Sequence, residues 1–196
     1  MYAELLATVT FTLVAYQDFR ERLVADWAWV PAAAGAVLMF IERPAIADLL
    51  ALKLALFVLV GLASIYLGVF GQADGLALMA MPVGVSVLSP MPQLFGGAIV
   101  ALAHIAYLFV INGFKKLEKT FPVEEAVKQD VWIPLEVTCE SQTTELSHSP
   151  ERAWEELEKF VGRNAVVRAS YGVPFAGYLA IGYISAFLFQ LAFGRL

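Results

Sequence analysis

Between Lys53 and Lys115 the chain carries only one formally charged side chain, Asp74. Soluble domains have about one charged residue in four, whereas this whole chain is 16% charged and 60% hydrophobic, with a mean hydropathy of +0.71. A soluble protein of 196 residues cannot bury so long an uncharged stretch. At about 20 apolar residues per crossing, the stretch is long enough for two or three transmembrane helices. The sequence therefore predicts a polytopic membrane protein.

Six hydrophobic segments are predicted to span the membrane. They are Tyr2–Gln17, Trp27–Ile41, Ala47–Phe70, Gly75–Leu88, Leu94–Phe114 and Tyr171–Phe193. The second and fourth are short for a hydrocarbon core of about 30 Å, which requires local thinning or a neighbour that covers their ends. Pro82 is expected to kink the fourth segment, and Pro90 with Pro92 to break the chain before the fifth. No basic residue or small-residue cleavage site marks the first segment as a signal peptide, so we expect a retained span.

Polar residues are concentrated between the fifth and sixth segments. The stretch 114–168 holds 8 of the 13 basic and 11 of the 18 acidic residues. A strand is predicted there, with one face formed by Val131, Ile133, Leu135 and Val137. A polar loop is expected over Glu140–Ser149, followed by a helix with Ser149 as N-cap, Pro150 in its first turn and Gly162 as its stop. We therefore expect an all-α membrane protein of six spans with a small α/β insert: spans one to five in 1–114, a soluble domain in 115–170 and the sixth span in 171–196.

The basic residues predict how the chain is oriented. With the N-terminus outside, ten of the 13 basic residues are cytoplasmic, and only Arg43, Lys53 and Arg195 face the other side. This distribution satisfies the positive-inside rule. We therefore expect a multi-pass protein of the cell membrane with its insert, Asp18 and the Gly71–Gly75 turn on the cytoplasmic side.

Composition also excludes some functions. The net charge is −5 and no basic patch is present, which argues against nucleic-acid binding. Cys139 is the one cysteine, so neither an internal disulfide nor a CxxC metal site can form, and redox chemistry is not favoured.

Asp74 stands in the sequence Gly71-Gln72-Ala73-Asp74-Gly75, between the third and fourth segments. An ionisable group in such an apolar stretch is costly and usually functional. The small residues around it permit a tight turn and the close approach of a peptide backbone, so we expect Gly71, Gln72, Ala73 and Gly75 to support the turn and a substrate. The structural alternative is that Asp74 only N-caps the fourth helix.

Asp18 lies at the end of the first segment. By itself it could be an interfacial charge paired with Arg20 or Arg22. The expected topology, however, puts Asp18 and Asp74 at the same depth on the cytoplasmic side. Two carboxyl groups that share a site cannot both ionise easily, so one keeps a proton while the other deprotonates a water molecule. That division of labour is what an aspartyl protease requires.

Three blocks of sequence resemble the membrane-embedded prepilin and preflagellin peptidases, which are aspartyl proteases of the GxGD type, and particularly their archaeal branch. The first block, Asp18 to Trp29 (DFRERLVADWAW), is similar to D-x-R-x-R-x-V-x-D-W-x-W. The second, Gly71 to Asp74 (GQAD), is similar to GxGD, and the third, Val173 to Gly182 (VPFAGYLAIG), to V-P-F-x-P-x-L-A-x-G. The departures are Ala73 for glycine, Gly177 for proline, and Gly75-Leu76 where many relatives have a small residue and then lysine.

The resemblance implies that Asp18 and Asp74 are the catalytic pair. It implies cleavage of the N-terminal leader of archaellin-like or type IV pilin-like precursors at the cytoplasmic membrane boundary, so the expected partners are these precursors and the lipid bilayer. No metal or organic cofactor is expected, because the carboxyl pair activates water directly. The bacterial enzymes' cysteine-rich insert and N-methyltransferase activity have no counterpart here.

Three alternatives remain open. A presenilin-like intramembrane protease would use the same chemistry, but Asp18 is followed by Arg20 at a span end and no Pro-Ala-Leu motif is present. A transporter or channel could use Asp74 as an ion or proton site, although no inverted repeat is visible. An inactive scaffold is disfavoured by the presence of both aspartates.

Three further features have simpler interpretations. Asp26, next to Trp27, is expected to N-cap a helix and not to take part in catalysis. His104 is expected to bond to a neighbouring helix, with a proton relay as the alternative. The amphipathic segment Pro150–Val161 is expected to pack on its own domain, with substrate docking as the alternative.

Overall fold

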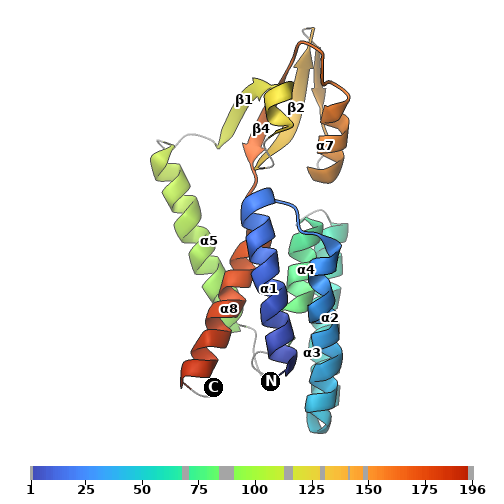
Figure 1. Ribbon diagram of the computed structural model, residues 1–196, viewed down its shortest axis with the longest axis vertical. Coiled ribbons are helices and arrows are strands. Elements are labelled where there is room, and N and C mark those ends of the chain that lie inside the picture. The colour runs from blue at the N-terminus through green and yellow to red at the C-terminus, as the bar shows by residue number, and fades with distance from the viewer. Residues whose placement is uncertain are drawn as a thin grey trace. The chain divides into compact units, whose positions relative to one another are not determined.

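The computed structural model describes residues 2–67, 71–83, 91–112, 117–128, 131–140, 142–147 and 150–193. The chain divides into two compact units (Figure 1). One is helical and comprises Met1–Phe19, Leu23–His104 and Pro174–Leu196. The other comprises Arg20–Arg22 and Ile105–Val173 and contains the sheet.

Each of the six hydrophobic segments contains a helix. These are α1 (Tyr2–Glu21), α2 (Val30–Glu42), α3 (Ala47–Tyr66), α4 (Gln72–Ala80), α5 (Met91–Ile111) and α8 (Phe175–Phe193). A short 3₁₀ helix, Asp26–Trp29, directly precedes α2. In the described part of the chain, three helices are long and apolar enough to cross a membrane: Pro44–Tyr66, Gln93–Ile111 and Phe175–Phe193. With 13 and nine residues, α2 and α4 are shorter than a bilayer core requires. The structure thus supports a membrane protein with three candidate spans, and the full six-span layout remains a proposal.

Several helix boundaries differ from the predicted segment ends by a few residues; α1, for example, ends at Glu21 and not at Gln17, and α5 begins at Met91 and not at Leu94. The last helix begins at Phe175 and not at Tyr171, because Ala165–Tyr171 pairs as a strand and Pro174 favours a new helix start. Helix α4 ends at Ala80, shortly before Pro82. The predicted end at Leu88 and the predicted break at Pro90 lie outside the described residues.

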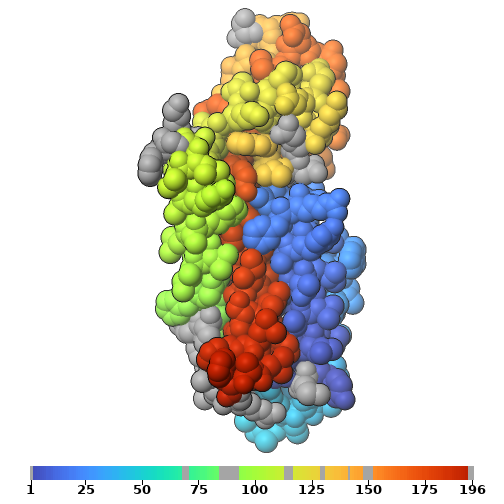
Figure 2. Space-filling model, turned by 60° about the vertical axis from the view of Figure 1, so that its left-hand side comes forward, coloured from blue at the N-terminus to red at the C-terminus, as the bar shows by residue number. Residues whose placement is uncertain are grey.

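Glycines bring the helices of the first unit into backbone contact. A Cβ atom at Gly61 of α3 would lie 2.6 Å from the carbonyl oxygen of Gly75 in α4, and one at Gly97 of α5 would lie 2.9 Å from that of Tyr178 in α8. Contacts of this kind are how membrane helices approach closely. On its other side α8 packs on α1, where the rings of Phe11 and Tyr183 stack with their centroids 4.3 Å apart. Helix α8 therefore lies between α1 and α5 (Figure 2).

The second unit is a four-stranded antiparallel sheet in the order β1-β4-β2-β3. Its elements are β1 (Glu118–Pro122), α6 (Val123–Ala126), β2 (Trp132–Cys139), β3 (Gln142–Glu145), α7 (Pro150–Glu158) and β4 (Ala165–Tyr171). Buried side chains from the strands and both helices form one hydrophobic core, whose members include Phe121, Val137, Leu157 and Val167.

Strand β2 forms where a strand was predicted, but its side chains do not share faces in the way that was predicted. A β-bulge between Pro134 and Glu136 leaves Leu135 without a pairing partner on β4. Because a one-residue insertion reverses the alternation of faces, Trp132 and Val137 both pack on the core. Ile133 and Val137 therefore point to opposite faces of the sheet and do not share one.

The other predictions for this unit have mixed outcomes. The expected loop Glu140–Ser149 contains strand β3, whose Thr143 and Thr144 suit an exposed edge strand. Helix α7 begins at Pro150 as predicted, but it ends at Glu158, before Gly162, which has a φ of +79°. The predicted N-cap, Ser149, lies outside the described residues.

Candidate active site

The first turn of α8 has two backbone N–H groups that no residue of its own helix can satisfy. The first N–H groups of any helix lack an intrahelical acceptor, and Pro174, just before Phe175, has no side-chain acceptor to cap them. The N–H of Ala176 donates to Oδ1 of Asp74 at 2.9 Å, and the N–H of Gly177 donates to Oδ2 of Asp18 at 2.6 Å. Two aspartates from other helices thus take the place of an N-cap.

Asp18 lies one turn before the end of α1 and faces the interior of the helical unit. Only 5% of its surface is exposed, so Asp18 is buried, whereas the alternative interpretation expected an interfacial charge paired with Arg20 or Arg22. Arg20, named in that interpretation, forms an exposed ion pair with Glu21 at 3.8 Å. Arg22 donates to the carbonyl oxygen of Gly172. Asp18 is therefore a buried carboxyl group held by a backbone N–H.

Asp74 lies in the first turn of α4, and each of its two oxygens has a separate partner. Oδ2 accepts the N–H of Gly71 at 3.2 Å, and Oδ1 accepts the N–H of Ala176. The N-cap residue of α4 is Gly71, and Asp74 is the third residue of the helix, so the structural alternative assigned the N-cap to the wrong residue. One oxygen of Asp74 nevertheless closes the first turn of α4, while the other reaches α8.

Consecutive N–H donors keep the two carboxyl groups close together. The covalent path between neighbouring backbone nitrogens is about 4.3 Å, so with the two hydrogen bonds the acceptor oxygens of Asp18 and Asp74 are less than about 10 Å apart. Asp74 lies outside the three candidate spans. Burial, and then the negative charge of Asp18, raise the pKa of Asp74 to about 7 from an ordinary 3.8, although the N–H groups of Gly71 and Ala176 oppose the change.

The turn residues predicted to support the site fall into two groups. Gly75 is buried against α3, where a Cβ atom would lie 3.0 Å from the carbonyl oxygen of Gly61 and would clash with Ile65. Ala73 packs partly against the core of the unit. Gly71 and Gln72 are exposed. Gly75 therefore fixes Asp74 to α3, while the exposed pair is open to solvent; a role in substrate contact remains a prediction for all four.

Sequence reasoning missed Ala176 and Gly177, which supply the two N–H donors. Both lie in the third block of the resemblance, where no role was assigned to them. Gly177 has no room for a side chain, because a Cβ atom there would lie 2.7 Å from the ring of Phe19 and 3.3 Å from Oδ2 of Asp18. The signal that could have revealed them is Pro174, which opens a helix without a capping side chain.

Two other predicted residues are now located. Asp26 is exposed and is the first residue of a 3₁₀ helix whose N-cap is Ala25, so the prediction that Asp26 is an N-cap is wrong. His104 is bonded to a neighbouring helix as expected, through the hydroxyl of Tyr178 in α8.

The arrangement is two carboxyl groups from separate helices joined by one turn of a third. In the described residues no three His, Cys, Asp or Glu side chains cluster as metal ligands. The charge of Asp18 acts on Asp74, so the two carboxyl groups do not ionise independently, and such a pair can supply one base and one acid. In comparisons with known proteins, the chain matches no family model, no curated protein and no solved structure.

Proposed function

We propose that the protein is a membrane aspartyl endopeptidase that removes the N-terminal leader from archaellin-like or type IV pilin-like precursors at the cytoplasmic boundary of the membrane. The observation that supports this most strongly is the pair of hydrogen bonds that ties Asp18 and Asp74 to consecutive N–H groups of α8. The resemblance gives further support, since its three blocks contribute Asp18, Asp74 and the N–H donors respectively.

The proposed reaction uses the carboxyl pair and one water molecule. The ionised carboxylate takes a proton from water as the water oxygen attacks the carbonyl carbon of the scissile peptide, and the protonated carboxyl donates its proton to the carbonyl oxygen. When the tetrahedral intermediate collapses, the C–N bond breaks and the amine leaves with the proton first taken from water. The returned hydroxyl proton restores the starting state of the pair.

The topology we propose has six membrane helices, an external N-terminus and a cytoplasmic insert. In this arrangement α1, α2 and α4 are membrane helices that are too polar or too short to be recognised by length and hydropathy. The excess of basic residues on the proposed cytoplasmic side supports the orientation. Asp18 and Asp74 then lie at the membrane boundary, where water is available for hydrolysis.

Co-expression with a precursor that carries a pilin-like leader tests the proposal. The parent protein should shorten the precursor on a gel, while Asp18→Asn and Asp74→Asn should abolish the shift and remain inserted, because asparagine keeps one oxygen that can accept the α8 N–H. Asp74→Asn loses the second oxygen, which accepts the N–H of Gly71, but Gly71 is exposed and its N–H can donate to water. Asp26→Asn is the matched control and should cleave normally, since Asp26 is exposed. Normal processing by either site variant would remove that aspartate from the mechanism.

The same hydrogen bonds also support a second candidate function, in which Asp18 and Asp74 only stabilise the start of α8. The two aspartates cap α8 whether or not they catalyse. The asparagine variants separate the two functions, since a purely structural cap tolerates them. An ion or proton pathway through Asp74 would instead be revealed by ion flux in vesicles that contain the parent protein and no precursor.

A further inference from the structure

Tyr178 follows directly after the residue that donates to Asp18. Its side chain is 1% exposed, and a hydrogen bond of 2.5 Å joins its hydroxyl to Nδ1 of His104. His104 lies on α5, within the candidate span Gln93–Ile111. A polar pair in an apolar span is costly to keep unless it is satisfied and serves a purpose.

The ring of Phe19 completes a cluster with these two residues. It contacts Tyr178 edge-on with the centroids 5.7 Å apart and lies 6.4 Å from the imidazole of His104. Phe19 follows Asp18 in α1, and its ring also occupies the space beside Gly177. The cluster therefore borders both the Asp18 carboxyl group and the N–H that binds it.

Another part of the contact between α5 and α8, which also bears on how α8 is rotated, consists of glycines. Gly96 and Gly97 of α5 pack directly on the backbone of α8 around Gly182. Glycines allow a close approach but present no side chains that interlock. Because α8 lies between α1 and α5 (Figure 2), the directional contact of Tyr178 with His104 is well placed to set that rotation.

We propose that His104 is a positioning residue of the site. It binds Tyr178 and thereby holds the first turn of α8 in the rotation at which the N–H groups of Ala176 and Gly177 reach Asp74 and Asp18. The inference rests on the proposed peptidase function for its kinetic consequence, but its structural consequence does not depend on that function.

Kinetics in vesicles provide the first test. Tyr178→Phe and His104→Leu should each lower kcat about ten- to a hundred-fold with KM unchanged, because misplaced carboxyl groups slow the chemical step and not substrate binding. The double variant should be no slower than the slower single variant, since both remove the same hydrogen bond. Effects that multiply in the double variant would overturn the proposal.

A matched control is available on the same helix. The hydroxyl of Tyr183 is also buried and donates to the carbonyl oxygen of Val83 at 2.5 Å. Tyr183→Phe removes a hydrogen bond of the same type away from the carboxyl pair and should leave kcat within about two-fold of the parent. If Tyr178→Phe affects kcat no more than Tyr183→Phe does, the contact with His104 is merely structural.

A measurement without substrate separates this inference from the proposed function. Amide resonances of protein labelled with ¹⁵N-glycine and ¹⁵N-alanine can be assigned for Gly177 and Ala176 from the shifts that Asp18→Asn and Asp74→Asn produce. Tyr178→Phe and His104→Leu should both move these resonances, and Tyr183→Phe should not. Resonances that stay in place in the first two variants would overturn the positioning role, even if the protein cleaves precursors; resonances that move would support it even if it cleaves none.

Discussion

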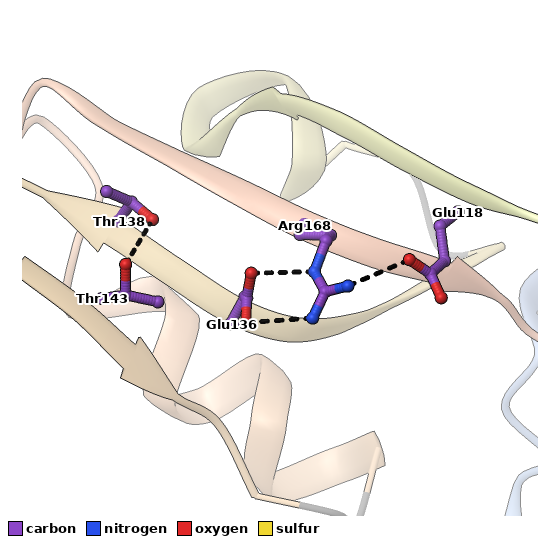
Figure 3. Close-up of polar contacts among 5 residues, drawn as sticks. All are labelled: Glu118, Glu136, Thr138, Thr143 and Arg168. Atoms are coloured by element: carbon purple, nitrogen blue, oxygen red, sulfur yellow. Dashed lines mark hydrogen bonds and ion pairs between the residues drawn. The ribbon is translucent and has the colours of Figure 1, made fainter.

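The two units of this protein handle carboxylates in opposite ways. On the face of the sheet opposite its core, Arg168 of β4 lies between two glutamates (Figure 3). It donates two hydrogen bonds to Glu136, at 2.8 and 3.0 Å, and one to Glu118 at 3.0 Å. The hydrogen bond and charge of Glu136, and then the charge of Glu118, raise the pKa of Arg168. In the helical unit, Asp18 and Asp74 accept backbone N–H groups.

The difference indicates which carboxylates are available for chemistry. The two glutamates of the sheet share one cation, Arg168, whose side chain is 43% exposed, and such surface networks contribute little to stability. In the described residues no lysine or arginine pairs with Asp74, so burial and Asp18 together favour its protonated form. A carboxyl group that changes protonation near neutral pH is suited to acid–base catalysis.

Alanine substitutions should separate the two regions most strongly. Asp74→Ala should lower the cleavage rate by about 10²- to 10⁴-fold. It should also reduce the free energy of unfolding by about 1–3 kcal/mol, because the N–H groups of Gly71 and Ala176 lose their acceptor. Glu136→Ala should leave the cleavage rate within about two-fold of the parent. Initial cleavage rates and unfolding in vesicles measure both quantities. A Glu136→Ala protein as inactive as Asp74→Ala would contradict the claim that only the carboxyl groups of the helical unit take part in catalysis.

The pH dependence of cleavage should reflect Asp74 and not the sheet. With its pKa near 7, Asp74 loses its proton as the pH rises through about 7, so the rate should then fall by up to about ten-fold per pH unit. The free energy of unfolding should also fall as the pH rises from about 4 to 7, because over that range Asp74 is protonated in the folded state and ionised in the unfolded state. Rate profiles of the parent and of Asp26→Asn should coincide. A rate that is constant from pH 6 to 9 would contradict a protonated Asp74.

Two glycines on either side of Asp74 should show a smaller but clear difference. Gly75→Ala must displace Ile65 or the backbone at Gly61, and we expect it to cost about 1–3 kcal/mol of unfolding free energy. Gly71→Ala meets only Oδ2 of Asp74 at 3.5 Å, an ordinary contact distance, and should cost less. Thermal unfolding of the two variants makes the comparison directly. Equal losses would mean that α4 is not fixed to α3 at Gly75.

Much of the helical unit could be predicted from the sequence, because long apolar segments and sparse charges determine where helices form. The positions of Asp18 at the end of α1 and of Asp74 at the start of α4 follow from the same pattern. Helix α7 begins at Pro150 because proline suits the first turn of a helix.

The remaining features depend on long-range packing. Pro174 shows only that the first N–H groups of α8 lack a local cap; nothing near Ala176 or Gly177 in the sequence shows that their acceptors are carboxylates about 100 and 160 residues away. In the second unit, the bulge at Leu135 exists because β2 pairs with β4, and it cannot be read from an alternating pattern. Strand β3 forms on the edge of a sheet that local composition does not reveal.

The central claim is that Asp18 and Asp74 act as one acid–base unit, and the most direct test is non-additivity. We would reconstitute the parent protein, Asp18→Asn, Asp74→Asn and the double variant in vesicles and measure kcat for a precursor with a pilin-like leader. If the two carboxyl groups share one catalytic proton, each single variant should be about as slow as the double variant, because removing either half disables the unit. Losses that multiply in the double variant, or a single variant that cleaves at the parent rate, would contradict the account.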